Sequence, residues 1–335
     1  SLKIQSESLN LQSITEPQVI DRSLLVERLI EDSDIALAYA RERCKSSLKY
    51  ICTTFLKFTD WDVCHDDLEN FIKTSTKKKK IILIPRGHLK SSIITIGWTI
   101  QQILIDPDTT ILLANAVWDN ARSFLSEIKE YLTSKSFLPK LFGKFESDTW
   151  TKEEITINQR VRANKTSTIS TAGVEKSLAS QHYKIIICDD LVNRQNVTNA
   201  EQIDKIKKFY SDALDLLEPD GTLLIIGTRW VDGDLYGSIL DTKGKQFEQF
   251  DVYVKGATKD GTIDGEVIFP KKFSTKKLYE LRDGKGIEDG MGSFEFFAQY
   301  FNQCIQVDAQ HFKVPFRYWN SLPDGTCHYG SFDPA

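Results

Sequence analysis

Three segments of this sequence place reactive side chains at or shortly after the end of a short apolar run. They are Lys90-Ser91 after IILI (81–84), Asp189-Asp190 after III (185–187) and Thr228-Arg229 after LLIIG (223–227). Lysine and serine side chains can bind phosphate oxygens and a metal ion, and paired carboxylates can bind a metal ion or activate water. Apolar runs of this length are typical of buried strands, and parallel sheets bind ligands beyond the carboxyl ends of their strands. The three segments therefore predict one site at one edge of a sheet.

The segment IILIPRGHLKSS, residues 81–92, nearly matches a phosphate-binding loop between a strand and a helix. The usual pattern G-x-x-x-x-G-K-[ST] has glycines where this chain has Ile84 and Leu89. Glycine is useful in such loops because it allows positive φ and close approach of the backbone. Only Gly87 remains, so Leu89 must tolerate this geometry or the loop must have another shape. Taken alone, the segment also fits a surface loop whose lysine and serine are merely solvated.

The run IIICDD, residues 185–190, is similar to a Walker-B strand, in which an apolar strand delivers an aspartate to Mg²⁺. In this interpretation Asp189 binds the metal ion, directly or through water, and Asp190 orients and polarises the attacking water. A turn or helix cap built from two aspartates is the alternative. The two motifs together favour nucleotide binding. Roughly a hundred residues separate them, which indicates an additional strand between the two motif strands.

Hydrophobic periodicity predicts the elements that must position these residues. Apolar residues at spacings of three and four predict helices near the N-terminus, whereas the middle of the chain alternates apolar strands with helices. Expected strands are 81–84, 111–116, 153–158, 167–173, 183–190 and 221–230. Expected helices are 21–58, 65–76, 91–105, 118–132 and 199–217, the last one opened by a cap at Asn199. After about residue 240 we expect strands over 246–257 and 265–270, and helices over 274–283 and 293–303.

Apolar strands that alternate with helices predict a mainly parallel sheet covered on both faces. We therefore expect an α/β fold of the P-loop NTPase class, RecA-like with an additional strand and a catalytic carboxylate. An N-terminal helical segment and a small accessory lobe would complete it. The expected boundaries are 1–60 for the helical segment, 61–240 for the ATPase core, 241–320 for the lobe, and 321–335 for a linker and the first strand of a further domain.

Composition excludes several classes of protein. The 335 residues include 41% hydrophobic and 27% charged residues, which is ordinary for a globular protein. A formal net charge of −4 argues against binding nucleic acid with the whole surface, although local basic patches remain compatible with it. The six cysteines form no C-x-x-C pair, and we identify no secretory signal and no apolar run long enough to span a membrane. We expect reduced thiols in a cytoplasm, and no membrane partner.

Four segments, in this order, resemble the large terminase subunit of tailed bacteriophages, the motor that packages viral DNA. They are PRGHLKSS (85–92), ISTAGVEKSLASQHYKIIICDDLV (169–192), LLIIGTRWVDGDLYG (223–237) and HYGSFDPA (328–335). Terminases have deviant phosphate loops with an arginine four residues before the lysine, the place of Arg86. The second and third segments are similar to the Walker-B region and the coupling motif of the family. The resemblance covers 81–240 and, more weakly, the tail.

The resemblance implies a role for each motif residue. The nucleotide-binding loop would comprise Pro85, Arg86, Gly87, His88, Leu89, Lys90, Ser91 and Ser92. Lys90 would hold phosphates, Ser91 and Asp189 would hold Mg²⁺, and Arg86 would sense or stabilise the γ-phosphate charge in cis. His88 could also contact phosphate, although a histidine in a loop has many structural roles.

Two further assignments are implied with alternatives left open. Thr228 and Arg229 would couple hydrolysis to movement of the accessory lobe, but Arg229 fits a structural ion pair equally well. The family usually has glutamate after the Walker-B aspartate, whereas this chain has Asp190. A shorter carboxylate can still act as the base, provided that it sits closer to the water.

The whole family's activity would make this chain an Mg²⁺-dependent ATPase with ATP and Mg²⁺ as cofactors. It would drive double-stranded DNA into a procapsid in the host cytoplasm. Its partners would be the portal protein, the small terminase subunit and further copies of itself in a ring. Asp333 matches a metal ligand on the first strand of the family's nuclease domain. Because two-metal hydrolysis needs several carboxylates, we expect an ATPase without nuclease activity.

Other functions remain open at this point. A helicase-like ATPase would share the chemistry, but we find no further helicase motifs after residue 240. A nucleotide-binding assembly module that does not hydrolyse ATP is compatible with the altered loop. Candidate DNA contacts are the segment QRVRANK (159–165), Lys205, Lys207 and Lys208, for which a solvated face is the simpler interpretation. Trp61 and Tyr50 could stack on adenine, although core packing is the favoured interpretation of each.

Overall fold

The computed structural model describes residues 34–133, 136–175, 181–285 and 288–304, and its centre is a seven-stranded sheet. The strand order is β3-β4-β2-β5-β6-β1-β7. The strands are β1 (Lys79–Leu83), β2 (Ile111–Asn115), β3 (Glu154–Ile155), β4 (Ile169–Gly173), β5 (Tyr183–Asp189), β6 (Leu217–Gly227) and β7 (Phe250–Val254). All neighbours pair in parallel except β3, which runs antiparallel to β4. Because β6 lies between β1 and β5, the expected α/β class with an additional strand is confirmed.

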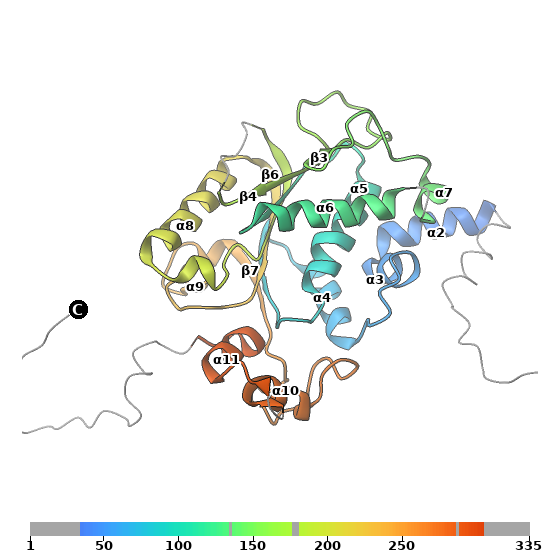
Figure 1. Ribbon diagram of the computed structural model, residues 1–335. Coiled ribbons are helices and arrows are strands. Elements are labelled where there is room, and N and C mark those ends of the chain that lie inside the picture. Colours follow the sequence, from blue (N-terminus) through green and yellow to red (C-terminus); the bar gives the residue numbers. More distant parts are fainter. Residues whose placement is uncertain (1–33, 134–135, 176–180, 286–287, 305–335) are drawn as a thin grey trace, which may run out of the picture.

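Helices cover both faces of the sheet, as the absence of polar alternation in the strands requires (Figure 1). One layer contains α2 (Asp34–Ser46), α3 (Leu48–Tyr50), η1 (Ile51–Phe55), α4 (Val63–Thr74), η2 (Ser91–Trp98), α5 (Thr99–Ile105), α6 (Trp118–Leu132) and α7 (Leu138–Phe142). The other layer contains α8 (Ala200–Asp215) and α9 (Leu235–Leu240), with the short turns η3 (Gln195–Val197) and η4 (Phe247–Gln249) nearby in the chain. Asn199 caps α8 as expected, because its side chain accepts a hydrogen bond from the backbone of Gln202 at 2.9 Å. None of the helices within the described ranges combines the length and apolar character needed to cross a bilayer.

A third cluster of buried side chains lies in a small lobe at the carboxyl-end edge of the sheet (Figure 1). Its elements are α10 (Thr275–Asp283), β8 (Gly284–Lys285), β9 (Glu288–Asp289) and α11 (Ser293–Phe301). Two expectations need correction here. The strand expected over 246–257 is not part of the lobe, because β7 pairs with β1 and extends the central sheet past residue 240. The expected strand 265–270 reduces to a single bridge between Thr258 and Val267.

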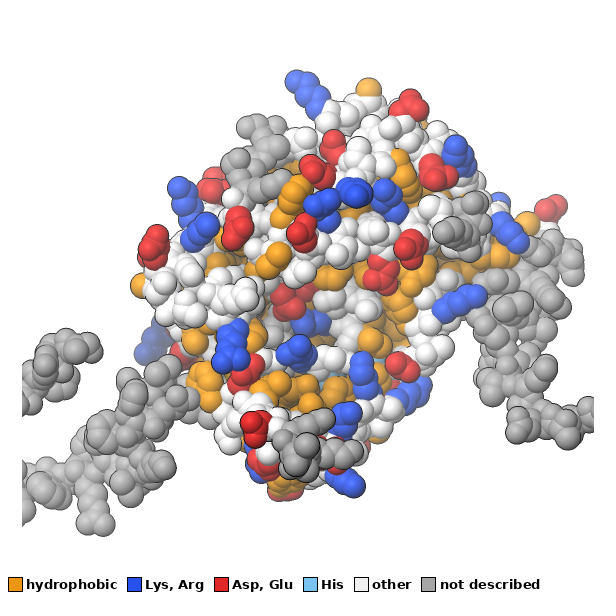
Figure 2. Space-filling view, in the orientation of Figure 1, with side chains coloured by type: hydrophobic (Ala, Val, Ile, Leu, Met, Phe, Trp, Pro, Cys, Tyr) orange, Lys and Arg blue, Asp and Glu red, His pale blue; other side chains and the backbone are white. Residues whose placement is uncertain are grey.

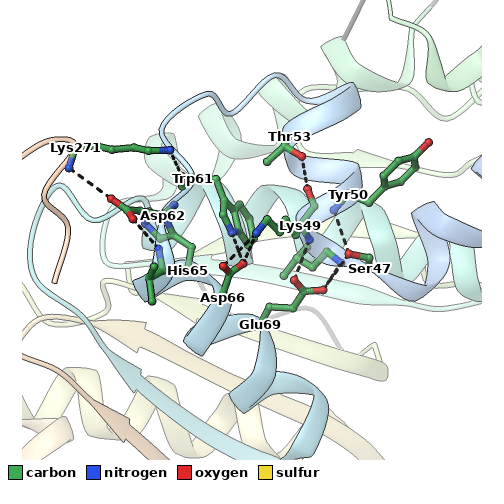
Figure 3. Close-up of polar contacts among 12 residues, drawn as sticks. Ser47, Lys49, Tyr50, Thr53, Trp61, Asp62, His65, Asp66, Glu69 and Lys271 are labelled. Carbon is green, nitrogen blue, oxygen red and sulfur yellow. Dashed lines mark hydrogen bonds and ion pairs between the residues drawn. The ribbon is translucent and has the colours of Figure 1, made fainter. Parts of the chain in front are cut away.

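Polar contacts around α3 and α4 tie the N-terminal helices to the lobe (Figure 3). The Glu69 carboxylate accepts hydrogen bonds from the first backbone amides of α3, at 2.8 Å from that of Leu48. Asp66 accepts from the indole nitrogen of Trp61 at 2.8 Å, and Lys271 of the lobe donates to the Trp61 carbonyl. Trp61 is 5% exposed, so it serves packing rather than stacking on a base. This frame holds the lobe against the segment that precedes β1.

Candidate nucleotide-binding site

The carboxyl ends of β1, β6 and β5 lie side by side and bring the three sequence motifs together. Leu83 pairs with Gly227 in the register of β1 and β6, and Asp189 pairs with Ile226 in the register of β5 and β6. The loop after β1 leads to Lys90, which directly precedes η2. Adjacent parallel strands thus deliver their motif residues to one edge, where ligands of such sheets bind.

Lys90 and Asp190 form an ion pair at the centre of this edge. Lys90 Nζ lies 3.3 Å from Asp190 Oδ2, and the lysine is 9% exposed. Asp190 has a φ of 47°, and its backbone amide donates to the Ile226 carbonyl at 2.8 Å. Positive φ is uncommon at residues with a side chain, although aspartate adopts it more readily than most, and such residues cluster at functional sites. Figure 2 shows basic and acidic side chains together between the sheet edge and the lobe.

Asp189 is buried beside this pair and is held from two directions. Its Oδ2 accepts a hydrogen bond from Thr95 Oγ1 at 2.5 Å, and its backbone carbonyl accepts one from Asn115 Nδ2 at 2.7 Å. Its Oδ1 is buried without a hydrogen-bond partner among the described residues. Burial raises the pKa of the Asp189 carboxyl group, and the Asp190 charge raises it further. Lys90 and the hydroxyl groups of Thr95 and Ser91 lower that pKa.

Sequence reasoning missed Thr95 and Asn115, although each carries a weak signal. Thr95 is a hydroxyl-bearing residue one turn after Ser91 in an otherwise apolar helix, and it is 1% exposed. Asn115 is the polar end of the apolar strand β2 and is 3% exposed. A buried polar side chain needs a hydrogen-bond partner. The sequence did not identify the partner of either residue, which is Asp189 in both cases.

The phosphate loop keeps a left-handed turn although it lacks the usual glycine before the lysine. Gly87 has a φ of 78° and Leu89 a φ of 57°. Leu89 is half-buried and packs against both the main core cluster and the lobe cluster. Left-handed backbone costs a residue with a side chain about 1–2 kcal/mol, and apolar burial of the leucine offsets this cost. The question that the sequence left open is answered, because Leu89 tolerates the glycine-like geometry.

The His88 ring packs into the lobe, while its Nδ1 lies 3.2 Å from the Arg86 carbonyl oxygen of the loop. Its ring is 1% exposed and stacks on Phe273, with ring centroids 4.7 Å apart and an interplanar angle of 10°. Burial lowers the pKa of His88 to about 4, so the ring is neutral at pH 7. The expectation that its side chain contacts phosphate is therefore corrected, because an aromatic pocket of the lobe encloses the ring.

Arg86 also contacts the lobe in this structure. Its backbone amide donates to the Gln299 carbonyl at 3.0 Å, and its guanidinium donates to Gln299 Oε1 at 3.1 Å. Gln299 in turn donates to Glu295 at 2.9 Å, and Glu295 lies 3.3 Å from Arg194, which follows the Walker-B-like strand. Helix α11 therefore holds one arginine from each side of the candidate site. Of the other expected loop residues, Pro85 is buried and Ser92 is half-buried.

The segment after β6 contacts the end of α11. Thr228 is 6% exposed at the end of the strand, and the Arg229 backbone amide donates to Asn302 Oδ1 at 3.0 Å. Asn302 Nδ2 donates to the Lys255 carbonyl at 2.8 Å. Asn302 therefore links the residue after β7 to the segment after β6. The Arg229 guanidinium donates to Asp232 at 3.0 Å, and this is the ion pair that the sequence left open as an alternative.

Other residues singled out from the sequence lie away from this edge or outside the described part of the chain. Arg160 donates to the carbonyls of Thr166 at 2.6 Å and Thr109 at 3.0 Å, so it stabilises its own loop. Lys205 and Lys208 are exposed on α8, and their contact with DNA stays a prediction. Asp333 lies outside the described residues.

No protein-family model and no curated protein sequence matches this chain. Among solved structures, it is similar to the HK97 bacteriophage large terminase, with a TM-score of 0.49 and 16% identity over 73% of this chain and 50% of that chain. It is similar to a mutant of the Thermus phage P74-26 large terminase ATPase domain, with a TM-score of 0.44 and 14% identity over 70% and 92% of the two chains. For the large terminase from a thermophilic bacteriophage, the TM-score is 0.38 and the identity 11%, over 68% of this chain and 51% of that chain.

The structures that this chain resembles are thus bacteriophage large terminases and an ATPase domain of one. The chain spans half the length of the HK97 protein that it matches. At TM-scores below 0.5 these similarities do not establish a function. The fold rests on the strand order and pairing of this chain, and its chemistry on its own residues.

Proposed function

We propose that this chain is the ATPase part of a motor that packages double-stranded DNA into a viral procapsid. The observation that carries the ATPase activity is the meeting of Lys90, Asp189 and Asp190 at one edge of the sheet, with the Lys90–Asp190 ion pair at 3.3 Å. The order of the motifs supports packaging over other ATPase functions, because Arg86 stands four residues before the lysine and Thr228-Arg229 follow the strand between the two motif strands.

The residues at the sheet edge fit a magnesium ion. Mg²⁺ prefers oxygen ligands and usually takes one or two from the protein, with substrate phosphates and water completing its shell. Asp189 Oδ1 is a buried carboxylate oxygen without a hydrogen-bond partner among the described residues, and Ser91 is the first residue of η2. The described residues include no cluster of three or more His, Cys, Asp or Glu side chains that could hold a metal ion alone. In this proposal the ion arrives with the nucleotide and would neutralise phosphate charge during hydrolysis.

Lys90 exchanges partners in this proposal. Without nucleotide its ammonium neutralises Asp190, and with ATP it binds the β- and γ-phosphates. The exchange leaves the Asp190 carboxylate free to accept a hydrogen bond, and then a proton, from the attacking water. Asp190 is shorter than the usual glutamate, so its carboxylate has to lie closer to the attacking water.

Arg86 has to leave Gln299 before it can stabilise charge on the γ-phosphate. Arg86 is exposed and its guanidinium is held to the lobe by one side-chain hydrogen bond, so a change of side-chain rotamer would release it. Thr228 and Arg229 then report the state of the site to α11 through Asn302. Double-stranded DNA, the portal protein, the small terminase subunit and neighbouring copies in a ring are the proposed partners, acting in the host cytoplasm.

Steady-state ATP hydrolysis tests the proposal. We expect Lys90→Ala and Asp189→Ala each to lower kcat by on the order of 100-fold or more, because each removes charge stabilisation from the transition state. Lys245→Ala is a control, since this exposed lysine lies away from the sheet edge. The assay includes DNA and portal protein so that assembly can complete the site. Wild-type activity in both site variants would refute this active site, and tight ATP binding without turnover by the wild type would favour a non-hydrolysing assembly module.

A further inference from the structure

Thr95 is a buried hydroxyl-bearing residue whose side chain bonds to Asp189, its one side-chain partner among the described residues. It lies in η2 among Ile93, Ile94 and Ile96, all of which are buried. Its Oγ1 donates to Asp189 Oδ2 at 2.5 Å, across 94 positions of sequence. A charge-assisted hydrogen bond of this length belongs to the strong class. The contact lies outside the lysine–serine pair of the phosphate loop, because Thr95 is one turn further along the helix.

The contact leaves the two oxygens of Asp189 in different situations. Oδ2 is occupied by Thr95, whereas Oδ1 is buried and has no partner among the described residues. The backbone at Asp189 is fixed as well, because Asn115 Nδ2 donates to its carbonyl at 2.7 Å. A carboxylate whose backbone and one oxygen are both held cannot rotate freely. The orientation of Oδ1 is therefore fixed. A buried oxygen without a partner requires an explanation, such as a bound ion.

We infer that Thr95 is a positioning residue, which orients the Asp189 carboxylate so that Oδ1 is presented to the metal ion of a bound metal–nucleotide complex. This inference rests on the proposed function and adds to it a residue outside the sequence motifs. Partners that orient metal ligands typically contribute about 10- to 100-fold to metal affinity. Loss of the hydroxyl leaves Asp189 in place but lets its carboxylate rotate, so metal binding weakens while nucleotide contacts made without metal persist.

The test measures Mn²⁺ binding in the presence of ADP by electron paramagnetic resonance, with Mn²⁺ as the probe ion. The variants are Thr95→Val, which keeps the shape without the hydroxyl, and Thr95→Ser, which keeps the hydroxyl. Thr99→Val is the matched control, because Thr99 is buried one turn further on and its hydroxyl has no partner in the described structure. A fluorescent ADP analogue in EDTA measures metal-independent binding, and circular dichroism verifies folding. Thr95→Ala replaces Thr95→Val if the latter does not fold.

We expect Thr95→Val to weaken Mn²⁺ binding by about 10- to 100-fold, while Thr95→Ser and Thr99→Val stay within about threefold of the wild type. Binding of ADP without metal should be unchanged in all variants. Mn²⁺ affinity of Thr95→Val within about twofold of the wild type overturns the inference, as does an equal loss in Thr99→Val. If the wild type itself binds no Mn²⁺ with ADP, the proposed function fails first and takes this inference with it.

Discussion

At the scale of single residues, the phosphate loop uses packing where a typical loop uses glycine. Leu89 adopts a φ of 57° and is held between the core and the lobe. Lys90 follows it directly and pairs with Asp190 at 3.3 Å. Leu89 therefore directly precedes the lysine proposed to bind phosphate. The backbone conformation of Leu89 determines the direction in which the Lys90 side chain leaves the loop.

Because Leu89 has a left-handed backbone, we expect glycine to be the more stabilising replacement at this position, whereas alanine is usually the better of the two. Leu89→Ala and Leu89→Gly lose the same packing, but only glycine relieves the left-handed strain. We therefore expect Leu89→Gly to be more stable than Leu89→Ala by about 1 kcal/mol, measured by denaturant unfolding. Equal stabilities, or a more stable alanine variant, would contradict a positive φ at this position.

The buried His88 ring makes stability depend on pH in a defined window. Its pKa is lowered from 6.5 to about 4 by burial, so the unfolded chain binds a proton between these pH values that the folded chain does not. Stability contributed by the neutral ring is present above pH 6.5 and lost as the pH falls toward 4, by about 3 kcal/mol at most.

The variant His88→Phe keeps an aromatic ring in the lobe without a titrating group. We expect the free energy of unfolding to fall less steeply between pH 6.5 and 4 than in the wild type. Some slope should remain, because burial also lowers the pKa of His65. Identical slopes for variant and wild type would show that His88 is not buried in its neutral form.

At the scale of elements, α11 is the part of the lobe that contacts the candidate site most directly. Its Gln299 holds Arg86 of the phosphate loop, and Asn302 just after the helix holds the backbone of Arg229 beyond β6. The helix therefore contacts two of the segments that would change when nucleotide binds. A helix so placed can transmit the state of the site to the rest of the lobe.

The Arg86–Gln299 contact should oppose ATP binding, because Arg86 has to leave it to reach the γ-phosphate. We expect Gln299→Leu to tighten ATP binding by about 3- to 10-fold relative to ADP, the value of one hydrogen bond. The gain should disappear in an Arg86→Ala background, which a double-mutant cycle of calorimetric affinities measures. Gln303→Leu is the control, since the exposed Gln303 contacts Gly261 instead. A gain that persists without Arg86 would assign the effect to α11 alone.

At the scale of the whole molecule, the lobe and the sheet share buried contacts. His88 of the loop packs on Phe269 and Phe273, and Cys64 of α4 belongs to the lobe cluster. Lys271 of the lobe also donates a hydrogen bond to the carbonyl of Trp61, which precedes α4. Contacts of this kind from both the loop and α4 make the lobe an extension of the core.

Phe269 is fully buried in the lobe and tests this continuity. We expect Phe269→Ala to lower the free energy of unfolding by about 3–5 kcal/mol, because it leaves a cavity. Hydrogen exchange should report the loss in β1 as well as in α10, since the two unfold together. Val161→Ala, at an 88% exposed position, should change stability by no more than about 0.5 kcal/mol. Loss of protection confined to α10 and α11 would mean that the lobe unfolds independently.

The sequence by itself determined the elements and the chemistry of the strand ends. Helix 118–132, the cap at Asn199 and the strand ending at Asp189 were all predictable, because apolar spacing and capping are local properties. The spacing of the motifs predicted an additional strand between the two motif strands, but strand pairing decided that this strand is β6, which follows both motifs in the chain. The roles of Lys90 and Asp189 remain predictions, although the structure brings both residues to one edge.

Tertiary structure decided what depends on partners far apart in the chain. The Thr95–Asp189 hydrogen bond spans 94 positions and the Arg86–Gln299 bond spans 213, so neither pair has a local pattern. The pairing of β7 with β1 likewise joins segments far apart in the chain. The change in composition near residue 240 had instead suggested that this strand belongs to the lobe. Leu89 occupies a left-handed conformation that its residue type disfavours, because packing against two clusters outweighs local preference.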